Sequence, residues 1–251
     1  MGKIIAVVNQ KGGVGKTTSA VNLTAALHDL GLKVLLVDFD PQANASSGLG
    51  VDKKRLKSSV YDVVINNAPV TTAIVKTPHG DVLPSHPDLA GAGVELLNVP
   101  SPQHQLAGAL QAIKPHYDLI LIDCPPSLEL LTLNGLCAAD GILVPVQCEY
   151  YALEGLSDLM STLRAVKRKL NPRLEIFGVA LTMFDGRTNF SSQVAQEVRR
   201  HFPGKVFTTV VPRNIRLAEA PSHGIPVTVY DRSSRGAVAY RAMAEEIKAK
   251  L

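Results

Sequence analysis

The sequence predicts a doubly wound α/β fold, in which a mostly parallel sheet carries helices on both faces. Two patterns support this prediction: short runs of Val, Ile and Leu recur along the chain, and amphipathic segments separate most of them. Continuous apolar runs indicate strands buried on both faces, and helices between them indicate parallel crossover connections. The chain has 251 residues, 46% of them hydrophobic, and no repeat, low-complexity tract or linker divides it. We therefore expect one domain spanning residues 1–251.

Five apolar runs are expected to form strands, and they occupy residues 3–9, 33–38, 118–123, 141–146 and 176–182. Helical periodicity predicts helices over 16–30, 60–66, 152–170 and 190–202, the first of them closing at Gly31. The last segment, 236–251, is expected to be a packed helix because its apolar residues recur at helical spacing, at Tyr240, Met243, Ile247 and Leu251. Residues 51–100 contain scattered Pro and Gly and allow no further detailed prediction.

The composition argues against a membrane or disulfide-stabilised protein. No stretch reaches the roughly 18 uninterrupted apolar residues that span a bilayer, and the N-terminus leads directly into a predicted strand, so we expect a cytosolic protein. The three cysteines, Cys124, Cys137 and Cys148, form no Cys-x-x-Cys pair. Their odd number and spacing favour buried free thiols over disulfides or a zinc site.

The net charge of +4 is unevenly distributed along the chain. Residues 1–150 hold 10 Lys and Arg against 13 Asp and Glu, giving −3, whereas residues 151–251 hold 16 against 9, giving +7. Lys and Arg on solvent-exposed helix faces would account for the positive charge of residues 151–251. The more specific alternative is a surface that binds a polyanion. The counts alone slightly favour the first explanation.

A glycine-rich loop lies between the first predicted strand and the first predicted helix, and it reads Lys11-Gly12-Gly13-Val14-Gly15-Lys16-Thr17-Thr18. Glycines let backbone N–H groups curl around a phosphate tail, while the following helix N-terminus adds its positive dipole end. Lys16 supplies a cation for the β and γ oxygens, the Thr17 hydroxyl can ligate Mg²⁺, and Thr18 can bond the α-phosphate side. The loop therefore predicts a P-loop that binds a nucleoside triphosphate with Mg²⁺.

Carboxylates follow two predicted strands at their carboxyl ends. Asp38 and Asp40 open the stretch Asp38-Phe39-Asp40-Pro41-Gln42-Ala43-Asn44, and Asp123 opens Asp123-Cys124-Pro125-Pro126-Ser127. Ligands collect at such strand ends, and a γ-phosphate needs groups that hold Mg²⁺ and orient the attacking water. A single Asp in this place often caps the next helix. Two such sets in one chain favour a catalytic site.

The loop departs from the common P-loop, because Gln10 stands where the first glycine is usual and Lys11 begins the glycine run. In this respect it resembles the deviant Walker A ATPases, whose loop is Lys-Gly-Gly-x-Gly-Lys-Thr-Thr. The resemblance implies an ATP sandwich dimer in which Lys11 reaches the partner's nucleotide. It also implies that Asp40 orients the water, that Asp123 is the Walker B carboxylate near Mg²⁺, and that Asp38 is a supporting acid.

Two further stretches resemble the ParA/Soj chromosome-partitioning branch of these ATPases, and the match covers essentially the whole chain. They occupy residues 145–155, Pro-Val-Gln-Cys-Glu-Tyr-Tyr-Ala-Leu-Glu-Gly, and residues 212–222, Pro-Arg-Asn-Ile-Arg-Leu-Ala-Glu-Ala-Pro-Ser. The resemblance implies adenine contacts at Pro212 and Asn214. It also implies DNA phosphate contacts at Arg187 and Arg216, which both lie in the basic part of the chain.

The same resemblance implies how such a protein works. ATP drives formation of a homodimer, the dimer binds double-stranded DNA without sequence specificity, and a ParB-like centromere-binding protein stimulates the hydrolysis that releases it. Such a protein is expected to be cytoplasmic and nucleoid-associated. The sequence contains no recognisable helix-turn-helix or other base-reading module, so we expect no separate DNA-binding domain and a strong dependence of binding on salt.

Three alternatives are weighed against this interpretation. A MinD-like membrane-positioning ATPase shares the loop and the dimer but adds a C-terminal amphipathic helix, and the charged end of this chain, with Glu245, Glu246, Lys248 and Lys250, disfavours lipid binding. Iron–sulfur relatives need cysteines at a dimer interface or in a Cys-x-x-Cys pair, and the sequence indicates neither. A nucleotide-binding regulator without useful turnover is the third alternative, because a sequence gives no rate.

Overall fold

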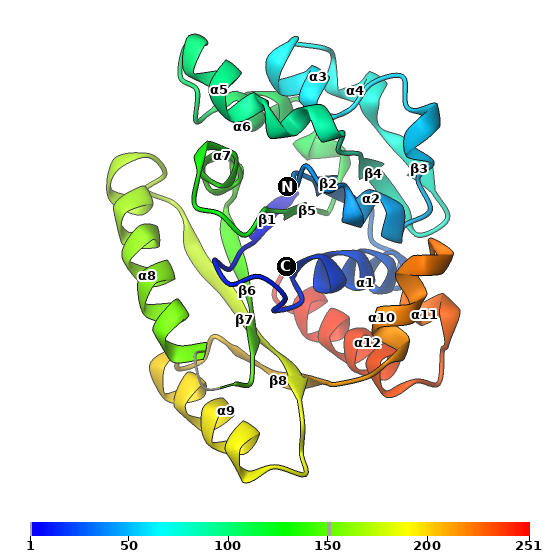
Figure 1. Cartoon of the computed structure of the whole chain (residues 1–251), viewed down its shortest axis with the longest axis vertical. Helices are drawn as coiled ribbons and strands as arrows, with labels where there is room; N and C mark the ends of the chain where they lie inside the picture. The colour runs from blue at the N-terminus through cyan, green and yellow to red at the C-terminus, as the bar shows by residue number, and fades with distance from the viewer. Residues whose placement is uncertain (1, 150–151) are drawn as a thin grey trace.

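An eight-stranded sheet forms the centre of the computed structural model, which describes residues 2–149 and 152–251 (Figure 1). In chain order the strands are β1 (Lys3–Val7), β2 (Val34–Asp38), β3 (Val75–Thr77), β4 (Gly80–Leu83), β5 (Leu119–Asp123), β6 (Gly141–Gln147), β7 (Glu175–Phe184) and β8 (Val206–Pro212). Their spatial order is β3-β4-β2-β5-β1-β6-β7-β8, and all neighbours are parallel except β3 and β4. The predicted fold class is confirmed.

Helices connect the strands and flank the sheet. The α-helices of the described residues are α1 (Lys16–Asp29), α2 (Asn44–Gly48), α3 (Val60–Ile65), α4 (Val70–Ala73), α5 (Ala92–Glu95), α6 (Gln105–Gln111), α7 (Leu130–Ala138), α8 (Ala152–Lys169), α9 (Asn189–His201), α10 (Arg216–Glu219), α11 (Val227–Tyr230) and α12 (Arg235–Lys248). Short 3₁₀ segments are η1 (Lys53–Arg55), η2 (Pro87–Ala90), η3 (Leu96–Asn98), η4 (Lys114–His116) and η5 (Ala220–His223). Tyr150 and Tyr151, within the stretch 145–155, lie outside the described residues.

The sheet separates two hydrophobic cores. Alternate side chains of β1 point to opposite faces: Ile4 and Ala6 belong to the core under α3 and α6 to α9, while Ile5 and Val7 belong to the core under α1 and α12. In Figure 1 the blue α1 and the red α12 lie on one side of the strands, and the green α7 and α8 lie on the other. The chain therefore covers both faces of β1, as its uninterrupted apolar run predicts.

The terminal helix packs as expected except at its last predicted position. Tyr240, Met243 and Ile247 are fully buried against α1 and the sheet, and the Tyr240 hydroxyl shares a buried hydrogen bond of 3.0 Å with Ser19. Leu251, however, lies beyond the end of α12 and is 44% exposed. Its inclusion in the packed face was wrong, because the helix ends before completing that turn.

The cysteines are free thiols, as predicted, but only two of them are buried. Cys124 and Cys148 lie in the core, whereas Cys137, near the end of α7, is half-buried. Burial raises the pKa of the Cys137 and Cys148 thiols to about 11. Burial also raises the pKa of the Cys124 thiol. All three thiols are thus protonated at neutral pH, so none is present as the reactive thiolate.

Candidate functional site

The predicted P-loop connects β1 to α1 at the carboxyl end of β1. Gly13 and Gly15 adopt left-handed backbone conformations, with φ of 74° and 90°, which side chains with a Cβ rarely tolerate. Gly15 directly precedes α1, so the loop turns sharply and leaves the first N–H groups of the helix without partners inside the helix. This geometry provides a cradle for an anionic phosphate group.

Lys16 is drawn into this cradle. Its side chain is only 7% exposed, and its Nζ donates a hydrogen bond of 3.2 Å to the carbonyl oxygen of Lys11. Burial lowers the pKa of Lys16, while the nearby charges of Asp123 and Asp40 raise it. The ammonium group is therefore held inside the loop, where phosphate oxygens would replace its neutral carbonyl partner with charged ones.

Two side chains that the sequence reasoning missed hold the loop in place. The Thr182 hydroxyl, from β7, donates a buried hydrogen bond of 2.8 Å to the Val14 carbonyl, 168 residues away in sequence. Asn9 accepts from the Lys11 N–H at 3.0 Å and donates to the Pro145 carbonyl at 2.8 Å. Only the position of Asn9 beside the loop could have indicated its role, and no local signal marks Thr182.

Asp38 and Asp123 lie side by side, because they end the adjacent parallel strands β2 and β5 in register. Both are fully buried. Asp38 accepts two hydrogen bonds of 2.7 Å from Ser46, one from its backbone N–H and one from its hydroxyl. Burial nevertheless raises the pKa of Asp38 to about 6. Ser46, which sequence reasoning missed, thus ties the loop after β2 to the sheet.

Asp123 differs from its neighbour, because neither of its buried carboxylate oxygens has a hydrogen-bond partner among the described residues. Burial and the charge of Asp38 raise its pKa well above the ordinary value, while Thr17 and Lys16 lie close enough to lower it. The Thr17 side chain lies near the Asp123 carboxylate, but the two do not meet the geometry of a hydrogen bond. Two orphaned oxygens beside a hydroxyl fit a hard cation such as Mg²⁺, which takes oxygen ligands.

Asp40 shapes the turn that leads to α2. Its Oδ1 accepts from the Gln42 N–H at 2.9 Å, and its backbone carbonyl accepts from the Ala43 N–H at 2.9 Å. The side chain is half-buried, and its charge acts on the pKa of both Asp123 and Lys16. The structure therefore brings Asp40 to the edge of the same site.

The predicted adenine contacts also reach this end of the sheet. Pro212 is the last residue of β8, and Asn214 follows two residues later. Both line a cavity of about 350 Å³ together with Gly15 and Thr18 of the P-loop. The Asn214 side chain accepts a 3.0 Å hydrogen bond from the Arg216 N–H, which fixes the turn. A larger cavity of about 760 Å³, near Lys33 at the opposite ends of the strands, contains none of the predicted site residues.

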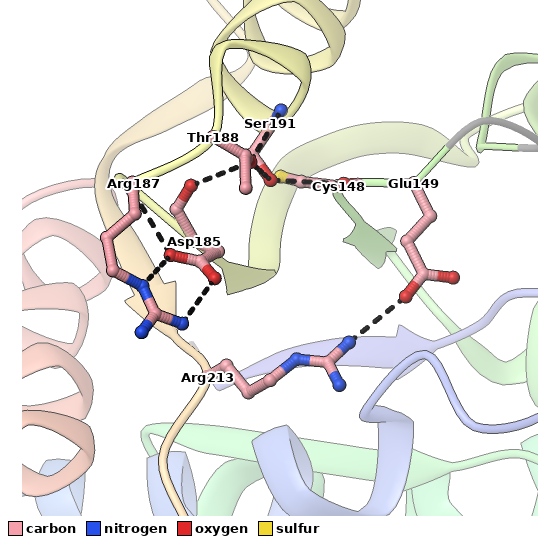
Figure 2. Close-up of polar contacts among 7 residues, drawn as sticks. All are labelled: Cys148, Glu149, Asp185, Arg187, Thr188, Ser191 and Arg213. Atoms are coloured by element: carbon pink, nitrogen blue, oxygen red, sulfur yellow. Dashed lines mark hydrogen bonds and ion pairs between the residues drawn. The ribbon is translucent and has the colours of Figure 1, made fainter.

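The two predicted DNA contacts are exposed arginines that form ion pairs within the chain. Figure 2 shows Arg187 facing Asp185, with Nη2 and Nε hydrogen bonds of 2.7 and 2.9 Å to the carboxylate. Arg216 lies 2.7 Å from Glu219 and 3.3 Å from Asp231. Neither arginine is among the residues that line the cavity of Pro212 and Asn214. They occupy a surface beside the nucleotide site.

A phosphate cradle at the carboxyl end of β1, with two buried aspartates on the neighbouring strands, defines a P-loop nucleoside triphosphatase. Comparison with known proteins narrows this class. A family model described as an AAA domain matches residues 2–176. The sporulation initiation inhibitor protein Soj of Bacillus subtilis is 55% identical over 251 residues, with 99% of each chain covered. The chromosome-partitioning ATPase Soj of Treponema pallidum is 48% identical, covering 100% of this chain and 98% of that protein. The chain therefore belongs to the ParA/Soj family of P-loop ATPases.

Solved structures agree with this membership. Cobyrinic acid a,c-diamide synthase of Mycobacterium smegmatis, with a bound ATP analogue and magnesium, is 37% identical, with a TM-score of 0.85 over 98% of this chain and 93% of that one. The cell division ATPase MinD of Pyrococcus furiosus is 33% identical, with a TM-score of 0.82 over 100% of both chains. As a member of this family the chain is an ATPase, with ATP and Mg²⁺ as its cofactors.

Proposed function

We propose that the chain partitions DNA: ATP binding joins two copies, the dimer binds double-stranded DNA without sequence specificity, and hydrolysis releases it. The observation that carries this proposal is the short stretch from Pro212 to Arg216. Its first residues line the cavity beside the P-loop, and it continues directly into an arginine of the proposed DNA surface. A nucleotide in that cavity would therefore contact the backbone stretch that positions Arg216.

Within the site, we assign phosphate binding to the P-loop N–H groups from Gly12 to Thr18, assisted by Lys16. Thr17 and Asp123 would hold Mg²⁺, which when bound supplies positive charge to the phosphate oxygens. Asp40 orients the attacking water from the edge of the site. Asp38 supports these groups by holding Ser46, and with it the loop that carries Asp40. Lys11 reaches the nucleotide of the partner copy.

Dimerisation explains how nucleotide can switch DNA binding. One copy offers a few exposed cations, whereas two joined copies raise the effective concentration of the second contact. Such linkage can increase affinity by roughly 10²-fold or more without any new contact. We propose that a ParB-like centromere-binding protein accelerates hydrolysis and so ends the DNA-bound state.

The test is binding of purified protein to unrelated duplex DNA with ATP, with ADP and without nucleotide, at two salt concentrations. Tight binding should require ATP, weaken with salt, and weaken further in an Arg216→Ala variant. Lys16→Ala, which removes the buried cation of the P-loop, should bind DNA poorly in every condition. Equal DNA binding by Lys16→Ala and wild type would show that nucleotide does not control the interaction.

A MinD-like role at membranes is the alternative function. The apolar face of α12 is occupied in the core, where Tyr240, Met243 and Ile247 pack against α1 and β8. Among the described residues no helix has both the length and the apolar character to cross a membrane. Sedimentation with anionic liposomes and ATP tests this alternative, and co-sedimentation without DNA binding would favour it.

We further propose that residues 1–251 act as one ATPase domain without a separate DNA-binding module. In a cell the protein would then be cytoplasmic and associated with the nucleoid. A fluorescent fusion should follow the DNA stain, and an Arg216→Ala fusion should spread evenly through the cytoplasm. Even distribution of the unmodified fusion would contradict this proposal.

A further inference from the structure

The residue between the two proposed adenine contacts is an arginine with a partner of its own. Arg213 follows β8, and its backbone N–H donates at 3.1 Å to the carbonyl of Phe184, the last residue of β7. Its Nη2 lies 3.0 Å from the Glu149 carboxylate, and its side chain is 63% exposed (Figure 2). Glu149 follows β6, so this pair joins two loops that are 64 residues apart in sequence.

Arg213 also lies next to the predicted DNA contact Arg187. Hydrogen bonds from Arg187 hold the pKa of Asp185 well below its usual range, and the positive charge of nearby Arg213 adds a smaller effect in the same direction. Figure 2 shows the Arg187 guanidinium turned toward Asp185, and the Arg213 side chain extending away from them toward Glu149. Arg216 begins α10 three residues further along the chain. The three arginines thus extend one exposed surface from the end of β7 to α10.

Each of these arginines is held by a carboxylate of the same chain. Asp185 contacts Arg187, Glu149 contacts Arg213, and Glu219 contacts Arg216, at distances between 2.7 and 3.0 Å. Asp231 adds a second carboxylate 3.3 Å from Arg216. The carboxylates therefore outnumber the arginines by four to three. As it stands, this surface does not present excess positive charge to a phosphate.

We propose that Arg213 is a third phosphate-contacting residue of the DNA surface, and that Glu149, Asp185 and Glu219 compete with DNA for the three arginines. This inference rests on the proposed DNA-binding function. A DNA phosphate must displace a carboxylate at each arginine, which weakens binding by a single copy. Each copy in an ATP-joined pair carries the same carboxylates, but the two copies add their phosphate contacts in one binding event. The joined pair can therefore hold DNA that a single copy, weakened by its own carboxylates, releases.

Glu149 offers the sharpest test, because its pair with Arg213 crosses between two loops. Glu149→Gln keeps an oxygen that can accept from Gln147 and Arg213 while removing the charge. Exposed ion pairs are weak, so DNA affinity with ATP should rise about three-fold. Arg213 also lines the cavity beside the P-loop, so all four proteins are compared at a saturating concentration of a non-hydrolysable ATP analogue. Under that condition Arg213→Ala should weaken DNA binding, and the double variant should bind like Arg213→Ala alone. Fluorescence anisotropy of a labelled duplex measures all four proteins.

A matched control separates competition from a general gain of positive charge. Asp52→Asn makes the same charge change in an exposed pair, where Asp52 lies 3.2 Å from Arg55 in η1. Its DNA affinity should stay within experimental error of wild type. Asp185→Asn should behave like Glu149→Gln, because it frees Arg187 in the same way.

The outcomes distinguish this inference from the function on which it rests. If wild type binds DNA only with ATP, and Glu149→Gln and Asp185→Asn match it, the competition does not exist. An additive gain in the Glu149→Gln/Arg213→Ala double variant would equally overturn the assignment of Arg213. If no protein binds DNA with ATP, the proposed function fails, and the competition fails with it.

Discussion

At the scale of single residues, Asp123 combines burial with two oxygens that have no partner among the described residues. Its neighbour Asp38 shares the same buried position at the strand ends, but Ser46 satisfies it. Leaving a buried polar group unsatisfied costs about 1–3 kcal/mol, and more if the group is charged. Without a cation the folded protein would therefore carry an energetic penalty at the position where a cation is expected to bind.

We predict that Asp123→Asn stabilises the protein without nucleotide and abolishes Mg²⁺-dependent hydrolysis. Removing a buried, unsatisfied charge should raise the free energy of unfolding at pH 7 by about 1–3 kcal/mol. Thermal melts without nucleotide, combined with a phosphate-release assay, measure both effects. Asp158→Asn, on the exposed face of α8, is the control and should change stability by no more than about 0.5 kcal/mol. A less stable Asp123→Asn protein would contradict the prediction.

The two aspartates also predict how stability depends on pH. In the folded protein the pKa of Asp38 is about 6, and that of Asp123 is well above its ordinary value, whereas an unfolded Asp titrates near about 3.9. A raised folded pKa means that the protonated form favours folding, so stability falls as pH rises from about 4 through about 6. The melting temperature of the nucleotide-free wild type should therefore drop between about pH 4 and about pH 6 through Asp38, with Asp123 acting in the same direction. The drop should be smaller in Asp123→Asn, and identical slopes would exclude these groups as its source.

At the scale of elements, β7 contributes to the nucleotide site through one hydroxyl. Thr182 connects this strand to the P-loop at Val14, so the loop is anchored from outside its own β1–α1 unit. Thr182→Val keeps the volume and removes the hydrogen bond, which is worth about 1 kcal/mol. We predict that it lowers the affinity for an ATP analogue about five-fold in an equilibrium titration.

Thr24→Val is the matched control for this variant. Thr24 is also buried, and its hydroxyl donates at 2.7 Å to the Ala20 carbonyl within α1, away from the loop. Its substitution should affect stability but leave nucleotide affinity unchanged. If both variants lost affinity equally, the effect would come from general destabilisation instead of the anchor.

The elements that the sequence predicted are those whose signals are local. The central strands are uninterrupted apolar runs, and the start of α1 is marked by the glycine loop, so fold class and P-loop were both predictable. Strand β8 was missed because the polar residues Thr208 and Thr209 interrupt its apolar run. Such polar residues are tolerated there because β8 lies at an edge of the sheet. The hairpin of β3 and β4 was missed because each strand has only three or four residues.

Long-range contacts explain what the sequence could not predict about the site. Lys16, Asp40 and Asp123 were found because each stands beside a strand end or in a motif. The anchor at Thr182 depends on the pairing of β6 with β7, and it belongs to an otherwise ordinary strand residue. The ion pairs of Arg187, Arg213 and Arg216 depend on how three loops meet, which no spacing reveals.

At the scale of the whole molecule, the proposed dimer makes Lys11 a residue of two sites. Within one chain its carbonyl oxygen accepts from Lys16, while its side chain makes no hydrogen bond or ion pair that the described structure records. We predict that Lys11→Ala stays monomeric with a non-hydrolysable ATP analogue, because the alanine keeps the carbonyl and loses the bridging cation. Sedimentation velocity measures the state. Lys33→Ala, at the opposite ends of the strands, should dimerise like wild type, and dimerisation of Lys11→Ala would contradict the assignment.

The central place of β1 in the sheet has a consequence for how the protein is made. Among the eight strands of the sheet β1 is synthesised first, yet its two neighbours are residues 119–123 and 141–143. The apolar strand and its glycine loop must therefore wait, unpaired, until about half of the chain has emerged, and the second neighbour follows only at residues 141–143. A nascent chain shorter than this has no sheet to support a nucleotide cradle, so the ability to capture ATP arises late in synthesis.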